Sequence, residues 1–440
     1  MNRTYPRNEG VLLAAILFGT ACVPAPVDDE EEATAAPTSG TGSTTEQATS
    51  SSASSSSDPT GGTTMDPEGS SSGDASSTSD DPTGGAGSCS EATLFAGDPT
   101  YALDETPDPV GEPLDGIPIP HRHLVFADGH LVTHVGEEIW AADLSAATPT
   151  FVRRVGAVQE GLQAFAPGPC VTARVAETRG LVALDDGSFA VADYLGNAIL
   201  VVDDLLGSAC EVRSIAGNAE PSTGVAEPPH VGDQDGTGTD AMLSGPKSLV
   251  RGGDGALYFI DDGNNKIKRV TAQGEVTTLA ELPSDQPVWN AMTSIGDDLY
   301  VVGTTSQEDA ILRVGSDGMV EVVLQGYGDL FPPLDSSMIA NLQGVTTDGV
   351  GLIVSAKGYV WYVADGVASP IAGVGLVPDY PPVGYDPFAT HPAAEVVLRH
   401  PNSGSTTGGA ALYVAYHEGD LYWNSVAAGA AYYIERIACP

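Results

Sequence analysis

The sequence contains few basic residues. Its 17 Lys and Arg stand against 59 Asp and Glu, which gives a formal net charge of −42. Residues 91–440 alone carry 46 acidic and 15 basic side chains. Because binding to a phosphate backbone requires the opposite sign of charge, this composition argues against nucleic acid as a partner. Acidity of this degree favours solubility and weak binding of divalent cations.

Long apolar segments and several catalytic motifs are also missing. The apolar run from Val11 to Gly19 is much shorter than the roughly 20 residues of a membrane-spanning helix. The eight histidines show no HExxH spacing, the chain has no GxSxG elbow, and no P-loop follows an expected strand. The sequence therefore lacks the usual signatures of zinc proteases, serine hydrolases and nucleotide-binding enzymes.

The short apolar run follows two arginines, a pattern that predicts a signal peptide over residues 1–22. The segment Leu17–Cys22 resembles a bacterial lipobox, which implies that Cys22 is lipidated and that only this lipid anchors the protein to the membrane. Val23 directly follows the cysteine, and by the same resemblance favours the outer membrane or the cell surface. The alternative is cleavage after Ala25, which would leave a periplasmic or secreted protein.

Residues 23–88 contain twelve Asp or Glu but no Lys, Arg or aromatic residue. The remainder is mostly Ser, Thr, Gly, Pro and Ala. Such a segment has too little apolar surface to offset the conformational entropy of folding, so we expect an acidic, disordered linker. The folded part is then expected to comprise residues 89–440.

Cysteine usage is consistent with export. Apart from Cys22 there are four cysteines, an even number that suits an oxidising compartment and allows three pairings. We expect Cys89 to pair with Cys439, because these two bracket the folded region and a ring-shaped fold brings its ends together. Cys170 would then pair with Cys210. No CxxC spacing occurs, which argues against a zinc ribbon.

Short apolar runs of four to six residues alternate with turns rich in Asp and Gly, and no long segment carries a helical period. These turns recur at Asp128, Asp186, Asp254, Asp297 and Asp348. The runs group into six four-stranded units, and such units must stack on one another to bury both faces. The sequence predicts an all-β fold, a six-bladed β-propeller, with seven blades as the next alternative.

The units resemble the NHL repeat family of propellers. The similarity is carried by Gly232–Ala241 before Gly245 and Pro246, and by Gly263–Val270 and Gly274–Leu279 after them. This resemblance implies a binding platform more often than an enzyme, and function has to be argued from the site itself.

Three scarce cations recur at the first strand of successive units, namely Arg122, Arg179 and Lys247. The innermost strand of each blade lines the central channel, so these side chains should gather at one mouth and attract a carboxylate, sulfate or phosphate group. The alternative is that each cation pairs with a neighbouring acid. Corresponding positions give three further candidate ligand-binding residues, His123, Asn290 and Gln343.

Metal sites are the remaining candidates. Asp233, Asp235 and Asp240 alternate around a glycine-rich loop and are candidate calcium ligands, although the loop lacks a closing bidentate Glu and its Asp-Gly-Thr-Gly pattern is also typical of a structural turn. Zinc is the weaker expectation. Peptidyl-amidating lyases resemble NHL propellers and hold a channel zinc with histidines from several blades, which here implies His123. The other aligned positions lack histidine and are Gly180, Ser248, Asn290 and Gly344. A zinc site would therefore have to recruit His230 or His391 from insertions.

No cofactor is required by these observations. We therefore expect a surface-anchored propeller that binds a small anionic molecule, a glycan or a protein partner through its channel mouth and insertion loops. The alternative is a metal-dependent lyase or hydrolase on the same fold.

Overall fold

The structure is a computed structural model. It describes residues 89–96, 123–135, 137–156, 165–218, 231–284, 288–304, 308–334, 341–375, 389–396, 413–426 and 432–439. All of these belong to the unit Thr78–Pro440. The expected signal peptide, the linker and Cys22 lie outside the described residues. In the described part of the chain, no helix is long and apolar enough to cross a membrane.

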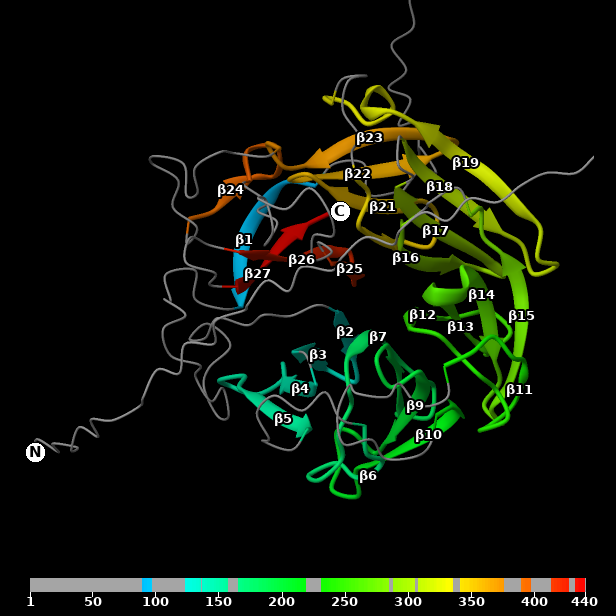
Figure 1. Ribbon diagram of the computed structural model, residues 1–440. Coiled ribbons are helices and arrows are strands. Elements are labelled where there is room, and N and C mark those ends of the chain that lie inside the picture. The colour runs from blue at the N-terminus through cyan, green and yellow to red at the C-terminus, as the bar shows by residue number, and fades with distance from the viewer. Residues whose placement is uncertain are drawn as a thin grey trace, which may run out of the picture. The chain divides into compact units, whose positions relative to one another are not determined.

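Six antiparallel sheets form the six blades of a β-propeller, which confirms the predicted fold (Figure 1). Blades 1, 4 and 5 have four strands each, and in all three the strands follow one another in chain order from the centre outward. Blade 1 consists of β2 (Leu124–Ala127), β3 (His130–Val135), β4 (Glu138–Asp143) and β5 (Phe151–Val155). Blade 4 consists of β16 (Val288–Ile295), β17 (Asp298–Thr304), β18 (Asp309–Val314) and β19 (Val320–Gly326). Blade 5 consists of β20 (Gly344–Thr347), β21 (Leu352–Ala356), β22 (Tyr359–Ala364) and β23 (Val367–Ala372).

Blades 2 and 3 carry an additional two-residue strand on the outer edge. Blade 2 consists of β7 (Thr178–Ala183), β8 (Phe189–Asp193), β9 (Ala198–Asp203) and β10 (Glu211–Gly217), with β6 (Gly168–Pro169) outside them. Blade 3 consists of β12 (Pro246–Arg251), β13 (Leu257–Asp261), β14 (Lys266–Val270) and β15 (Glu275–Glu281), with β11 (Gly236–Thr237) outside them. The described helices are three short 3-10 segments, η1 (Asp262–Asn264), η2 (Gly328–Leu330) and η3 (Ala393–Glu395).

Blade 6 is built from both ends of the folded region. It consists of β25 (Val414–His417), β26 (Asp420–Val426), β27 (Tyr432–Ala438), β1 (Glu91–Ala96) and the edge strand β24 (His391–Pro392). The N-terminal strand β1, blue in Figure 1, lies antiparallel to the C-terminal strand β27, in red. This pairing closes the ring with backbone hydrogen bonds, a feature that the sequence did not predict.

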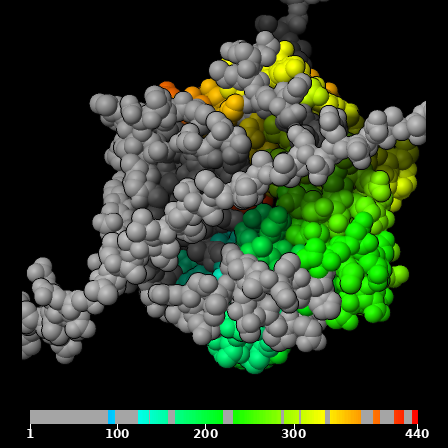
Figure 2. Space-filling view, viewed as in Figure 1, coloured from blue at the N-terminus to red at the C-terminus, as the bar shows by residue number. Residues whose placement is uncertain are grey.

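The inner strands form a closed ring in which each one contacts the next, in the order β2, β7, β12, β16, β20, β25 and back to β2. Gly180 in β7 is needed for one of these contacts, because a Cβ there would lie 2.6 Å from the backbone nitrogen of Leu249 in β12. In the space-filling view the green-to-yellow surface of blades 2 to 4 dips toward the centre of this ring (Figure 2).

The core is divided into six clusters, one at each junction between blades. Successive residues of a middle strand point to opposite faces and so enter different clusters. In β13, for example, Phe259 packs against blade 2, whereas Tyr258 and Ile260 pack against blade 4. Both faces of these strands are buried, which explains why they read in the sequence as continuous apolar runs.

Two disulfides are present, and both match the expected pairing. Cys89 is joined to Cys439 beside the β1–β27 ladder, and Cys170 is joined to Cys210 beside the β6–β10 edge. Because disulfides persist in oxidising compartments, they indicate an exported protein.

Candidate ligand site at the inner ends of the blades

The predicted channel residues lie at or just before the start of the inner strands. Arg122 is outside the described residues. The other five are His123 before β2, Arg179 in β7, Lys247 in β12, Asn290 in β16 and Gln343 before β20. Because every blade has the same strand order from the centre outward, all inner strands run in the same direction and their starting ends lie at one mouth of the ring. Blade 6 contributes Tyr413 at this level.

Irregular pairing redirects the side chains at three of these positions. The register between the first and second strands shifts across Arg179 in blade 2, between Lys247 and Val250 in blade 3, and across Asn290 in blade 4. A bulge of this kind turns a side chain away from the regular alternation of the strand. The bulges therefore allow long polar side chains to be placed on inner strands whose other side chains are mostly buried.

Arg179 is held by two neighbours. Its Nε donates to a carboxylate oxygen of Glu177 at 2.9 Å, and its guanidinium carbon lies 3.5 Å from the ring centroid of Tyr194. The side chain is 33% exposed, and its terminal Nη groups donate to no residue that the structure describes. A guanidinium offers five N–H donors in a fixed plane, so this arrangement leaves the end of the fork available to an anion.

Lys247 lies deeper in the same cluster. Its Nζ is 2.6 Å from Asp262 Oδ1, and the other carboxylate oxygen of Asp262 accepts a hydrogen bond from the Tyr194 hydroxyl at 3.1 Å. Burial lowers the pKa of Lys247, the Asp262 carboxylate opposes this shift, and the charge of Arg179 adds to it. The described cations therefore follow the alternative in which each pairs with a neighbouring acid. Arg179 and Lys247 do share one cluster, but each has a carboxylate partner, as expected in so acidic a domain.

The acidic partners in this cluster, Glu177 and Asp262, were not predicted from the sequence. They lie beside an aspartate that recurs at the end of the second strand. In blades 2 and 3 the second strand ends in a buried aspartate, Asp193 or Asp261, and the next residue is Tyr194 or Asp262. The Asp193 carboxylate accepts hydrogen bonds from the backbone N–H groups of Ala176 and Glu177, both at 2.9 Å. It thereby fixes the segment from which Glu177 reaches Arg179.

His123 lies against one other histidine and, in the described part of the chain, not in a group of three possible metal ligands. Its Nδ1 is 2.8 Å from Nε2 of the buried His134, and its ring lies 4.3 Å from that of Tyr413 in blade 6. His391 lies in β24 at the outer edge of blade 6, so it is not near the channel mouth as a zinc site would require. His230 lies outside the described residues. Within the described ranges, no group of three His, Cys, Asp or Glu could hold a metal ion.

Asn290 and Gln343 belong to the contact between blades 4 and 5. The Asn290 side-chain amide donates to the backbone oxygen of Leu342 at 2.6 Å. Gln343 is only 6% exposed, and its Oε1 accepts no hydrogen bond from the described part of the chain. The mouth therefore carries charge on the side of blades 2 and 3 and neutral amides on the side of blades 4 and 5.

The loop predicted to bind calcium holds lysines instead. Asp233 lies 2.5 Å from the Nζ of Lys266, and the fully buried Nζ of Lys268 lies 3.1 Å from Asp233 and 2.8 Å from Asp235. Asp235 also accepts from the backbone and hydroxyl of Thr278. These oxygens already have cationic or N–H partners, which supports the structural turn over the calcium site. The Asp240 carboxylate takes no part: Asp240 is bonded through its backbone, whose oxygen accepts from the Gln234 side chain and whose N–H donates to the Thr237 oxygen.

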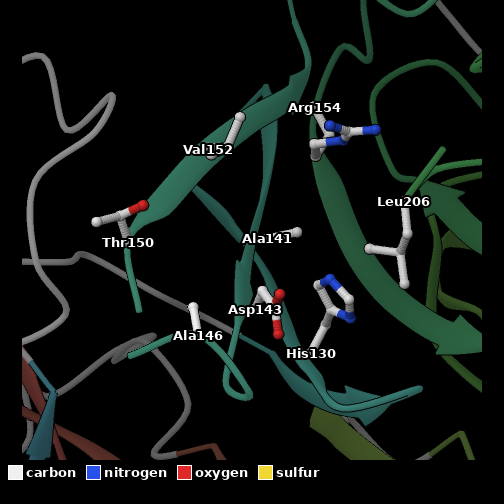
Figure 3. A pocket seen from close by; sticks show the side chains of 8 residues that line it. All are labelled: His130, Ala141, Asp143, Ala146, Thr150, Val152, Arg154 and Leu206. Atoms are coloured by element: carbon white, nitrogen blue, oxygen red, sulfur yellow. The ribbon is translucent and has the colours of Figure 1, made fainter. Parts of the chain in front are cut away.

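A separate hollow of about 130 Å³ lies on blade 1, away from the inner strands (Figure 3). His130 and Asp143, which are paired across β3 and β4, lie side by side at one end of it, and Leu206 from blade 2 lies beyond His130. Arg154 donates from Nε to the Leu205 oxygen at 2.6 Å and from Nη2 to the Gly207 oxygen. With its donors committed in this way, Arg154 serves as a link between blades 1 and 2.

Similarity to known proteins is found among solved structures and concerns the fold. No protein-family model matches the chain, and no curated protein matches it. The solved structures that are similar to this chain include the following three, each at 13% identity. A virginiamycin B lyase from Staphylococcus aureus with quinupristin has a TM-score of 0.40, with 72% of this chain and 94% of that chain covered. A protein of unknown function from Bacteroides thetaiotaomicron has a TM-score of 0.47, with 79% and 76% covered. A gluconolactonase from Xanthomonas campestris has a TM-score of 0.41, with 73% and 86% covered. At this identity and these TM-scores, the similarities assign no activity to the chain.

Proposed function

We propose that this protein is an exported propeller of NHL-type repeats, anchored to the outer membrane or cell surface through Cys22, that binds a ligand with an anionic group at the inner ends of its blades. The observation that carries the proposal is the state of Arg179. Its guanidinium is stacked on Tyr194, one-third exposed, and has terminal donors without a partner in the described chain.

The surroundings of Arg179 suit reversible binding of an anion. Glu177 occupies only Nε, so the two Nη groups can donate together to a carboxylate, sulfate or phosphate. Hydrogen bonds to a charged group contribute about 1.5 to 3 kcal/mol each. Lys247 and Asp262 form a neutral pair behind this contact, and Tyr194 joins that pair to the ring on which Arg179 is stacked.

Small molecules, glycans and proteins can all present such an anionic group. A matched pair of variants tests the site. Arg179→Gln removes the proposed contact, whereas Arg213→Gln changes an arginine of similar type on the outer strand β10, where it is half-exposed and paired with Asp203. With arginine side chains labelled by ¹⁵N, sodium acetate and sodium sulfate are titrated at low ionic strength and the Nε–H resonances are followed.

The proposal requires a saturable shift in the wild type and in Arg213→Gln that is lost in Arg179→Gln. Equal, non-saturable shifts in all three proteins would overturn it. Metal analysis of the purified wild type provides an independent comparison. Stoichiometric zinc or tightly held calcium would favour the alternative, a metal-dependent lyase or hydrolase.

A further inference from the structure

A hollow of about 180 Å³ adjoins the Arg179 cluster at the junction of blades 2 and 3. One wall is the turn after β8, and the other is formed by the segment that enters β12 and by η1. Its lining residues are Tyr194, Leu195, Asn197, Val231, Ser244, Gly245 and Gly263. Tyr194 thus belongs both to this hollow and to the Arg179 cluster.

Two glycines allow the walls to take this form. A Cβ on Gly245, which has a φ of +63°, would lie 2.7 Å from the Tyr194 ring, and a Cβ on Gly263 would lie 2.1 Å from Ser244 Oγ. Hydrogen bonds hold the same segments together: Gly245 N–H donates to Asn197 Oδ1 at 2.9 Å, and Gly263 N–H donates to the Ser244 oxygen at 2.8 Å. Part of the hollow is therefore bounded by backbone that these hydrogen bonds hold in place.

The lining combines carbon surface with a few polar groups. Leu195, Val231 and the ring of Tyr194 supply carbon surface, and Val231 is 46% exposed. The Tyr194 hydroxyl is directed to Asp262, and the Asn197 amide is bonded to the backbone. Ser244 Oγ is the one lining hydroxyl without a hydrogen-bond partner among the described residues. A small aliphatic group, with at most one polar contact, matches this surface.

The position of Arg179 adds a charge requirement. Its guanidinium lies 3.5 Å from the centroid of the same Tyr194 ring that lines the hollow. Lys247 is two residues beyond Gly245 and belongs to the same cluster. An aliphatic group in the hollow and an anion on the Arg179 guanidinium thus both lie against the Tyr194 ring, so a single ligand that reaches around the edge of this ring can meet both.

We propose that the hollow and Arg179 together bind an apolar carboxylate: the aliphatic group enters the hollow and the carboxylate binds the Arg179 guanidinium. This inference rests on the proposed anion site. The same chemistry is presented by a free acylated amino acid and by the C-terminal residue of a peptide, so both sources are compared in the test.

The probes are N-acetyl-L-leucine, N-acetyl-L-leucinamide, N-acetylglycine and the tripeptide Ala-Ala-Leu, each titrated by isothermal calorimetry or by the arginine resonances. N-acetyl-L-leucine should bind about tenfold more tightly than N-acetylglycine, because its isobutyl group is removed from water. It should also bind at least about tenfold more tightly than the amide, which lacks the charge. Comparable affinity for Ala-Ala-Leu would identify peptide C-termini as ligands, whereas binding of the free acid alone would identify the small molecule.

Two variants separate the hollow from the anion site. Val231→Ser removes apolar lining and should abolish the preference for leucine over glycine while N-acetylglycine binds as before. The control variant Val171→Ser changes an 80% exposed valine in blade 2, away from the hollow, and should alter neither the preference for leucine nor the affinity for N-acetylglycine. Arg179→Gln should weaken both acids. If Arg179→Gln weakens N-acetylglycine but leucine has no advantage, the anion site stands and the hollow is refuted. If neither acid binds to the wild type although acetate or sulfate does, the apolar carboxylate is wrong; if no anion binds, both proposals fail.

Discussion

Loss of the disulfide that closes the ring should destabilise the protein more than loss of the internal disulfide. The perturbations are the double variants Cys89→Ala with Cys439→Ala, and Cys170→Ala with Cys210→Ala. The bridges are well matched in packing, since each joins one buried and one partly buried cysteine. They differ in sequence separation, which is 350 residues for the closing disulfide and 40 for the internal one.

The expected magnitudes follow from the entropy that each cross-link removes from the unfolded chain. On the chain-entropy relation, closing the larger loop is worth about 6 kcal/mol and closing the smaller loop about 4 kcal/mol at 25 °C. The difference of about 2 kcal/mol is more secure than either value, because the packing losses are similar in the two variants. The longer loop should also give the larger rise in denaturant m value, since more of the unfolded chain becomes able to expand.

Guanidinium unfolding followed by tryptophan fluorescence measures both quantities. Hydrogen exchange adds a local readout, because the closing disulfide lies beside the β1–β27 ladder. In its absence the amides of β1 should exchange faster than those of β10, and the reverse should hold in the other variant. Equal costs for the two variants, or a larger cost for the internal bridge, would refute the argument from loop length.

Three other outcomes are expected. Asp235→Ala should lower the free energy of unfolding by about 2 to 3 kcal/mol because it removes a partner of the fully buried Lys268. Lys268→Met should lower it by less. If calcium stabilised the wild type but not Asp235→Ala, the lysine-binding role of Asp235 would be contradicted. Burial raises the pKa of Asp193 and of Asp261 to about 6, so the folded state binds protons more readily than the unfolded state. The free energy of unfolding should therefore increase as the pH falls from about 7.5 to about 5, by about 1.4 kcal/mol per group; a decrease in denaturant midpoints over this range would mean that the backbone N–H donors outweigh burial. Cys22→Ser should move the protein from the membrane fraction to the soluble fraction, and unchanged membrane association would exclude the lipid anchor.

The candidate site was only partly predictable from the sequence. The recurrence of cations at the first strand drew attention to Arg179 and Lys247, which lie close enough to interact because equivalent positions of equivalent blades meet at one mouth. Their partners could not be identified in the same way. Glu177 is held by Asp193, and Asp262 follows the second strand of blade 3, so each reaches its cation through folding of a turn and not through a strand period. The partner of Asp235 could not be predicted either. The spacing of this aspartate suits a calcium loop, but in the folded protein its carboxylate binds the Lys268 ammonium group.

The sequence by itself determined the all-β class and the six units, whereas the observed cysteine pairing was one of three that it allowed. Turn residues and apolar runs act locally, and the number of repeats follows from counting them. Tertiary structure alone decided that β1 completes blade 6, because its partner β27 lies more than 300 residues away and nothing near Glu91–Ala96 encodes that register. It also decided which charges are satisfied within the protein and which remain available at Arg179, since that depends on side chains brought together by separate blades.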